Sequence, residues 1–220
     1  MRTAVVTGAT GGIGSAVVAA LVGRGHRVVA LGRDADRLAR LARDGVTPVA
    51  HDLRRGRAAP PEVLELERLD ALVHCAGVAP VASVAGTTAE TWDEVLGTNL
   101  VGPARLTAAA LPALRAAQGA VVLVGMAPGL QDVPRWSAYA GSKAALRELA
   151  GSLRAEEPLL RVALVNPGGT ATPLLARVRH ELGRPYDPAT ALSPAAVAEA
   201  VADLLDSPAA GWRDVVDVLG

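Results

Sequence analysis

The chain has 220 residues with 22 basic and 22 acidic side chains, so its formal net charge is zero. This length suits one compact domain with a sizeable core, and we expect a single domain over residues 1–220. The balanced charge gives no electrostatic footprint for nucleic acid or for an anionic membrane surface. The only cysteine, Cys75, excludes an intrachain disulfide and is typical of a reducing compartment.

No apolar run approaches the roughly 20 residues that a membrane-spanning helix needs. The apolar start, Met1–Val6, is too short for a signal peptide and leads directly into a glycine-rich segment. We therefore expect a cytoplasmic protein without nucleic-acid or membrane partners.

Short β-branched runs alternate with alanine- and leucine-rich stretches along the chain. The expected strands are Thr3–Thr7, Arg27–Leu31, Thr47–Ala50, Ala71–His74, Ala120–Val124, Arg161–Val165 and Val215–Val218. The expected helices are Gly14–Gly23, Ala35–Arg43, Thr91–Leu114, Ala138–Glu156 and Pro194–Asp206. Such alternation with apolar strands predicts an α/β fold, a doubly wound parallel sheet with helices on both faces. Two proline-bearing segments remain, a polar loop at Arg54–Pro61 and a loop-and-helix lid at Thr170–Ser193.

A glycine-rich segment, Thr7–Gly14, follows the first expected strand and opens the first expected helix. Glycines there permit a tight turn and let backbone N–H groups approach a pyrophosphate at the positive helix N-terminus. A plain turn is the alternative, but the position between a strand and a helix favours a dinucleotide site. The residues expected to contact the dinucleotide are Gly8, Thr10, Gly12, Ile13 and Gly14.

The tip of the second expected strand bears on the choice between NADH and NADPH. Gly32 occupies the place where an acidic residue would bind the ribose, and Arg33 follows at once. An arginine there can meet a 2′-phosphate, which favours NADPH. The alternative is that Arg33 is solvated and Asp34 contacts the ribose. After the third strand, Asp52 and Leu53 are placed to hold adenine, or they form a simple strand-end turn.

Lys143 is the only lysine among the 22 basic residues, and it comes four positions after Tyr139, one of two tyrosines. On a helix this spacing places both side chains on one face. An ammonium near a phenol lowers the pKa of the phenol and prepares it to exchange a proton near neutral pH. The alternative is a surface lysine beside a core tyrosine.

The glycine segment, the Tyr-x-x-x-Lys pattern and their spacing together resemble the short-chain dehydrogenase/reductase family from Thr3 to the C-terminus. Further matches are Asp52-Leu53, Ala76-Gly77, Asn99-Leu100-Val101-Gly102 and Pro167-Gly168-x-x-x-Thr172. The resemblance implies a Rossmann fold of about seven strands, an NADP(H) cofactor, a small-molecule substrate and assembly as a homodimer or homotetramer. Nothing in the sequence predicts a metal site.

By that resemblance, Tyr139 donates a proton to a carbonyl oxygen and Lys143 binds the nicotinamide ribose and lowers the tyrosine pKa. Asn99 would hold a water that links Lys143 to solvent. Thr172 would orient the nicotinamide ring, unless it serves only as a helix N-cap. The backbone contacts that the resemblance adds to the cofactor site are Ala76, Gly77, Pro167 and Gly168.

The sequence departs from the family pattern in two places. His74 and Cys75 stand where the family usually has two asparagines, and we expect them to change the bracing of the sheet rather than the chemistry. Thirteen residues before Tyr139, where the family has its catalytic serine, lies Met126, which cannot donate a hydrogen bond. The hydroxyls that could compensate are Ser137 first, then Ser83 or Thr170.

Together these residues predict an NADPH-dependent oxidoreductase that reduces a ketone, quinone or imine by hydride transfer. We expect Met126, Trp136 and Tyr186 in the substrate pocket, while Arg135, Arg177 or Arg179 could meet an anionic group or remain solvated. The alternative is an NADP(H)-binding protein of this fold with weak or no redox activity, serving as a sensor, an assembly partner or a non-redox catalyst, because Met126 replaces the serine.

Overall fold

The computed structural model describes residues 1–55, 58–130 and 132–219. Within them, seven parallel strands form one sheet in the order β3-β2-β1-β4-β5-β6-β7. The strands are β1 (Thr3–Thr7), β2 (Arg27–Gly32), β3 (Val46–Ala50), β4 (Ala71–His74), β5 (Ala120–Val124), β6 (Arg161–Pro167) and β7 (Val215–Val218). The predicted doubly wound α/β sheet is therefore confirmed. Residues 56 and 57 of the expected loop Arg54–Pro61 lie outside the described residues.

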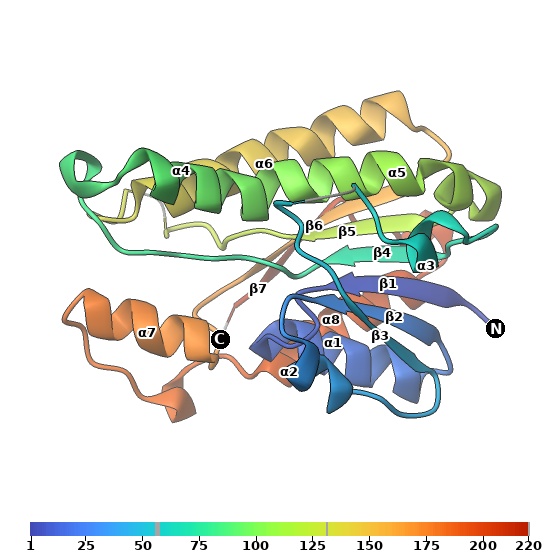
Figure 1. Ribbon diagram of the computed structural model, residues 1–220, viewed down its shortest axis with the longest axis horizontal. Coiled ribbons are helices and arrows are strands. Elements are labelled where there is room, and N and C mark those ends of the chain that lie inside the picture. The colour runs from blue at the N-terminus through green and yellow to red at the C-terminus, as the bar shows by residue number, and fades with distance from the viewer. Residues whose placement is uncertain (56–57, 131, 220) are drawn as a thin grey trace.

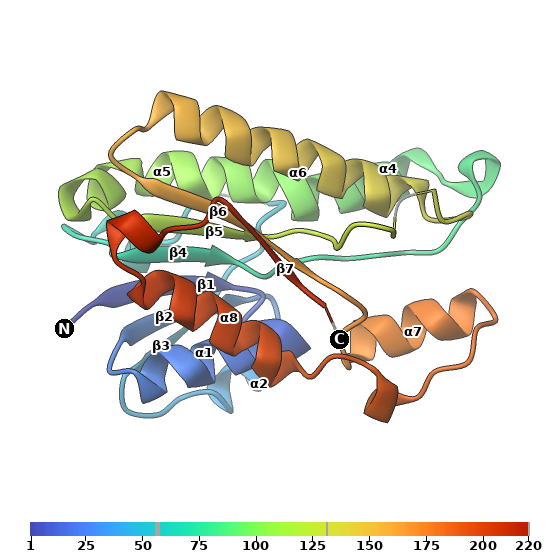
Figure 2. The same cartoon turned by 180° about the vertical axis from the view of Figure 1, so that it is seen from behind.

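Helices cover both faces of the sheet, as Figure 1 and its reverse view in Figure 2 show. On one face lie α4 (Ala89–Leu96), α5 (Gly102–Ala117) and α6 (Ser137–Glu156), and on the other lie α1 (Gly12–Gly23) and α8 (Pro194–Asp206). The shorter helices are α2 (Ala35–Ala39), α3 (Pro61–Leu64) and α7 (Pro173–Glu181). No helix among these described residues is both long and apolar enough to cross a membrane.

Each central strand buries side chains on both of its faces. In β1, Ala4 and Val6 belong to the core packed against α1 and α8, whereas Val5 belongs to the core packed against α5 and α6. Successive side chains of a strand point to opposite faces, so a strand covered on both sides must be apolar at every position. This explains why the strands read as continuous apolar runs in the sequence.

The predicted helix Ala35–Arg43 is too long, because α2 ends at Ala39. Residues after it leave the helix in order to enter the edge strand β3, and Arg43 forms an isolated antiparallel bridge with Val46. The turn between them uses Gly45 at φ +82°, a conformation that other residues rarely adopt. The end of this helix is therefore set by the turn into the sheet.

The predicted helix Thr91–Leu114 is interrupted, because a π-helical turn at Gly97–Val101 separates α4 from α5. Where α5 begins, the chain passes close to the loop after β3: a Cβ atom on Gly102 would lie 2.6 Å from the Cβ atom of Leu53. Single π-helical turns occur often at functional sites. Asn99 lies within this one.

The topology indicates where a ligand would bind. The strand order reverses between β1 and β4, and in doubly wound sheets the crevice at the carboxyl ends of such strands is the usual binding place. Figure 1 shows α7 beyond this edge of the sheet, on the opposite side of the molecule from the N-terminus.

Candidate active site

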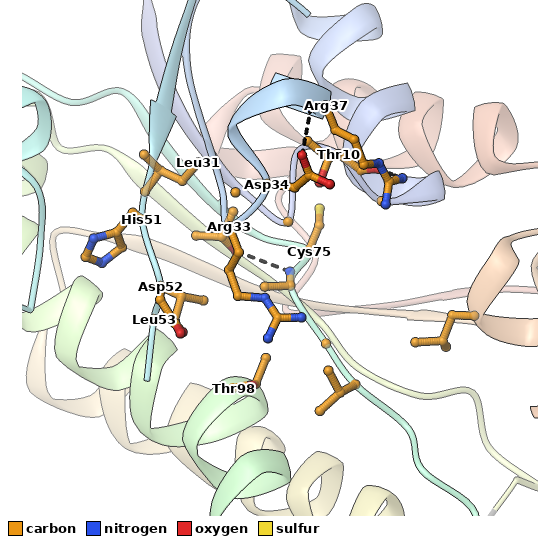
Figure 3. Close-up of a pocket in the computed structure, with 18 of the residues that line it drawn as sticks. Thr10, Leu31, Arg33, Asp34, Arg37, His51, Asp52, Leu53, Cys75 and Thr98 are labelled. Carbon is orange, nitrogen blue, oxygen red and sulfur yellow. Dashed lines mark hydrogen bonds between the residues drawn. The ribbon is translucent and has the colours of Figure 1, made fainter. Parts of the chain in front are cut away.

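A groove of about 480 Å³ lies over the carboxyl ends of β1, β2, β3 and β4 (Figure 3). The residues that were predicted to contact the cofactor and that line this groove are Gly8, Thr10, Arg33, Asp52, Leu53, Ala76 and Gly77. They come from the glycine loop and from the segments that follow β2, β3 and β4. The fold thus brings together residues that are up to about 70 positions apart in the chain.

The glycine loop leaves the N-terminus of α1 open. Gly8 has φ +63°, and a Cβ atom there would lie 2.7 Å from the backbone nitrogen of Ala76. The N-cap residue of α1 is Gly11, which offers no side-chain acceptor, and the first turn holds no acidic residue. The unpaired N–H groups and the helix dipole therefore fit an anionic group such as the diphosphate of a dinucleotide.

The two charged residues after β2 have different roles in the structure. The Asp34 carboxylate accepts a 2.9 Å hydrogen bond from the backbone N–H of Arg37, so it caps α2. The Arg33 side chain is directed into the groove toward Thr98 (Figure 3). Arg37, which sequence reasoning missed, also lines the groove and donates a 2.6 Å hydrogen bond from Nη2 to the carbonyl oxygen of Thr10. Arg33 precedes the N-cap of α2, so helical spacing gave no signal for Arg37 in the sequence.

A second cavity, of about 240 Å³, adjoins the groove and contains the Tyr139–Lys143 pair. The predicted cofactor residues that line it are Gly12, Ile13, Gly14, Pro167, Gly168 and Thr172. Arg37, Cys75 and Gly77 line both cavities, so the two form one continuous site. A dinucleotide lying in the groove would therefore reach Tyr139 with one end.

Helix α6 places Tyr139 and Lys143 on the same face, as their spacing predicted. Lys143 is buried, its Nζ atom donates a 2.7 Å hydrogen bond to the carbonyl oxygen of Val124, and it lies 5.7 Å from the centre of the Tyr139 ring. Burial lowers the pKa of Lys143 to about 8. The ammonium therefore stays charged at neutral pH but close to its titration.

The expected lowering of the tyrosine pKa is not what the structure shows. Burial raises the pKa of Tyr139 to about 12, because the phenolate would lose its hydration in the cavity. The Lys143 ammonium is held by Val124 and does not offset this cost. Tyr139 consequently remains protonated at neutral pH, which is the form that can donate a proton.

Asn99 fastens three parts of the site together through its carboxamide. Its Oδ1 accepts from the N–H of Val78 at 2.9 Å, and its Nδ2 donates to the carbonyl oxygen of Val78 at 3.0 Å. The same Nδ2 donates to Oγ of Ser142 at 2.9 Å, and that hydroxyl donates to the carbonyl oxygen of Tyr139 at 2.7 Å. The π-helical turn, the loop after β4 and α6 are thereby held in one arrangement around Lys143.

Met126 lines the cavity and is only 7 % exposed, in a cluster with Trp136 and Val178. Trp136 stacks on Tyr139, with ring centres 4.4 Å apart and planes at 24°. Leu130 and Leu174 also line this cavity, so its walls near the tyrosine are largely apolar. Such walls favour a compact substrate with little polar surface.

The three hydroxyls considered as replacements for the serine are placed differently. Thr170 lines the cavity, but its Oγ1 donates a 3.0 Å hydrogen bond to the carbonyl oxygen of Gly168. Ser137 and Ser83 are not among the described residues that line it, and Ser83 caps a 3₁₀ turn. Of the three hydroxyls, only that of Thr170, one of the two less favoured residues, belongs to the described lining of the cavity, so the structure does not support Ser137 as the first choice.

Tyr186 lies apart from Tyr139. It lines a neighbouring cavity of about 290 Å³, together with Arg179 and Asp187, and this cavity shares only Gly169 and Leu175 with the lining of the Tyr139 cavity. The structure thus does not bring Tyr186 into the cavity that holds Met126 and Trp136. The proline-rich segment after α7 carries it away, and nothing in the local sequence showed this.

His74 is a core residue, whereas Cys75 is partly buried and lines both cavities. His74 is 2 % exposed, its Nε2 atom forms a 2.9 Å hydrogen bond with Oγ1 of Thr107, and burial lowers its pKa to about 3. Burial raises the pKa of the Cys75 thiol to about 12, so it stays protonated. Within the described part of the chain, no group of three or more His, Cys, Asp or Glu side chains could hold a metal ion.

Comparisons with known proteins agree with this geometry. Residues 2–183 match the model of the short chain dehydrogenase family. The chain is 30 % identical to the NADP-dependent 3-hydroxy acid dehydrogenase of Salmonella typhi over 213 residues, which are 89 % of this chain and 86 % of that protein. A short-chain dehydrogenase/reductase family oxidoreductase from Burkholderia thailandensis is 35 % identical and superposes with a TM-score of 0.82, covering 100 % of this chain and 91 % of that one.

An alcohol dehydrogenase from Thermococcus sibiricus, complexed with 5-hydroxy-NADP, superposes with a TM-score of 0.84 at 26 % identity, covering 100 % of this chain and 96 % of that one. The family match spans most of the chain and includes the glycine loop, Tyr139 and Lys143. The chain therefore belongs to the short-chain dehydrogenase/reductase family of oxidoreductases.

Proposed function

We propose that the protein is an NADPH-dependent reductase of a small carbonyl compound or related electrophile, with Tyr139 as the proton donor. The observation that carries this proposal is the Tyr139–Lys143 pair in an apolar cavity that is continuous with the nucleotide groove. The bound cofactor would supply a hydride to the substrate carbon. Tyr139, which is protonated at neutral pH, would supply the proton to the oxygen.

Several other groups of the chain would support this chemistry. Lys143 is a buried ammonium 5.7 Å from the centre of the Tyr139 ring, and the family resemblance implies that it would bind the nicotinamide ribose. Asn99 holds the segment around Lys143 in position through Val78 and Ser142. Met126, Trp136 and Leu174 give the cavity around Tyr139 an apolar wall.

The preference for NADPH is supported by the charges at the end of β2. Arg33 extends into the groove, whereas the carboxylate of Asp34 is engaged in capping α2. A guanidinium that faces a 2′-phosphate favours NADPH, whereas a carboxylate that caps a helix is not available to bind the ribose hydroxyls of NADH. Two of the similar proteins carry NADP in their names, the Salmonella typhi dehydrogenase and the Thermococcus sibiricus complex.

The substrate class follows from the missing donor at position 126. A thioether cannot hydrogen-bond to a substrate oxygen as a serine hydroxyl does. We therefore propose substrates that are already polarised, such as quinones, activated dicarbonyl compounds or imines. The cavity of about 240 Å³ is suited to a compact molecule.

The experiment is NADPH oxidation over a panel of ketones, quinones and imines with Tyr139→Phe and Tyr186→Phe. Because proton transfer by a positioned side chain contributes about 10²–10⁴-fold, Tyr139→Phe should lose at least 10²-fold in kcat. Tyr186→Phe removes the same hydroxyl from the other tyrosine, which lines a different cavity, and should stay near the unaltered rate. Equal rates for Tyr139→Phe and the unaltered protein would contradict the proposal.

A second candidate is favoured by Met126 alone. Removal of one donor from such a site typically costs about 10²–10³ in rate, so the chain could bind NADP(H) and turn over little or nothing. Binding of NADPH without turnover of any compound in the panel would favour this candidate. If the unaltered protein did not bind NADPH at all, both candidates would be wrong.

A further inference from the structure

Helix α7 presents different side chains to three cavities. Leu174 and Val178 line the substrate cavity, Arg177 lines the nucleotide groove, and Arg179 lines the third cavity with Tyr186. Leu174, three residues before Arg177, lines the groove as well as the substrate cavity, because residues three and four apart on a helix share a face. Residues two apart do not share a face, so Arg179 is directed to another cavity than Arg177. Arg177 and Arg179 are therefore neighbours in sequence that point to different sites.

Arg177 has only a weak partner within the protein. Its Nε lies 3.9 Å from Oε1 of Glu181, and its side chain is 55 % exposed. An exposed pair of this length contributes little and does not fix the guanidinium. The guanidinium is thus available to an anion in the groove that it lines together with Arg33 and Arg37.

The start of α7 lies against the glycine loop. A Cβ atom on Gly12 would lie 2.5 Å from Cγ2 of Thr172, the N-cap of α7. The N–H groups of the first turn of α1 are open at the same place, because Gly11 provides no side-chain cap. An anion held at the N-terminus of α1 would therefore have α1 on one side and α7 on the other.

We propose that Arg177 binds the diphosphate of the dinucleotide from the α7 side, opposite the backbone N–H groups of α1. This inference rests on the proposed function, because it concerns the same cofactor. A guanidinium can pair with two phosphate oxygens at once, and the diphosphate carries negative charge on both of its faces. The contact joins α7 to the cofactor, and with it Leu174 and Val178, which form the wall of the substrate cavity.

The test compares Arg177→Gln with Arg179→Gln, because both remove one positive charge from the same helix and Gln has a helix propensity similar to that of Arg. Isothermal titration calorimetry measures Kd for NADPH and for NADH, and thermal unfolding without ligand verifies that each variant is folded. Both dinucleotides contain the diphosphate, so Arg177→Gln should raise both Kd values by about 10-fold and leave their ratio unchanged. Arg179→Gln should stay within about twofold of the unaltered protein, since its side chain lies on another cavity.

Three outcomes would overturn the inference or its basis. Equal Kd values for Arg177→Gln and Arg179→Gln would show that Arg177 does not contact the cofactor. A loss confined to NADPH would assign Arg177 to the 2′-phosphate, beside Arg33, and would refute the diphosphate contact. Failure of the unaltered protein to bind either dinucleotide would instead refute the proposed function on which the inference rests.

Discussion

A hydroxyl at position 126 tests whether the missing hydrogen-bond donor limits the reduction of simple ketones. We expect Met126→Ser to raise kcat/KM for simple ketones, because the new hydroxyl would lie on the wall of the cavity that holds Tyr139. The expected gain is of the size that other enzymes lose when one such donor is removed, about 10²–10³-fold in rate. Quinones and imines, which need the donor least, should gain much less.

The same substitution should cost stability. Met126 is 7 % exposed and packs with Ala79, Trp136 and Val178, so its replacement by a smaller polar residue removes buried apolar contacts. Truncation of a buried methionine costs about 2–5 kcal/mol, and the lower end applies here because the side chain already borders a cavity. For a chain of this size a loss of about 2 kcal/mol lowers Tm by roughly 4–8 °C.

The assay is steady-state NADPH oxidation with one simple ketone and one quinone, and Met126→Ala provides the control. Alanine opens the same space but supplies no donor, so it separates the hydrogen bond from the added volume. A gain for the ketone that appears equally in Met126→Ala would refute the donor argument. An unchanged ketone rate in a folded Met126→Ser that binds NADPH would refute it as well.

Three other predictions concern charge. Arg33→Gln should raise Kd for NADPH by about 10- to 100-fold and leave Kd for NADH nearly unchanged, as measured by calorimetry. An equal rise of both Kd values would contradict the assignment of Arg33 to the 2′-phosphate. Because burial lowers the pKa of Lys143 to about 8, its charge is present below that pH and lost above it. The value of kcat/KM should therefore fall as the pH rises through about 8, and Lys143→Met should abolish this fall. Burial lowers the pKa of His74 from 6.5 to about 3, so the unfolded chain takes up a proton that the folded chain excludes between these values. The free energy of unfolding is therefore highest above pH 6.5 and falls as the pH is lowered toward 3. Urea titrations should show that His74→Asn reduces the slope of the free energy of unfolding against pH by up to about 1.4 kcal/mol per pH unit.

Much of the fold could be predicted because the local pattern and the tertiary environment agree. A strand buried on both faces must be apolar throughout, so β1, β4 and β5 were predicted with the bounds that the structure shows. The same agreement holds for α8, where Ser193 caps the helix and Pro194 begins it. Local rules failed where a distant contact decides, as at the π-helical turn beside Leu53.

The candidate site divides in the same way. Sequence reasoning identified Tyr139, Lys143 and Arg33 from residue type and spacing, because a helix or a strand end fixes where such neighbours point. It misplaced Tyr186, whose position depends on the course of the proline-rich segment after α7, and it missed Arg37, whose position depends on the contact between α2 and the glycine loop. Contacts of this kind carry no local signature.

By itself, the sequence determined the alternation of strands and helices, the open N-terminus of α1, and the pairing of a tyrosine with the only lysine. These properties depend on side-chain chemistry and on helical and strand periods, which act over a few residues. Only the tertiary structure decided that Thr170 rather than Ser137 lines the cavity, that Tyr186 lines another one, and that the pKa of Tyr139 rises instead of falling. Burial and long-range packing set those outcomes, because desolvation depends on every element that surrounds a group and not on its neighbours in the chain.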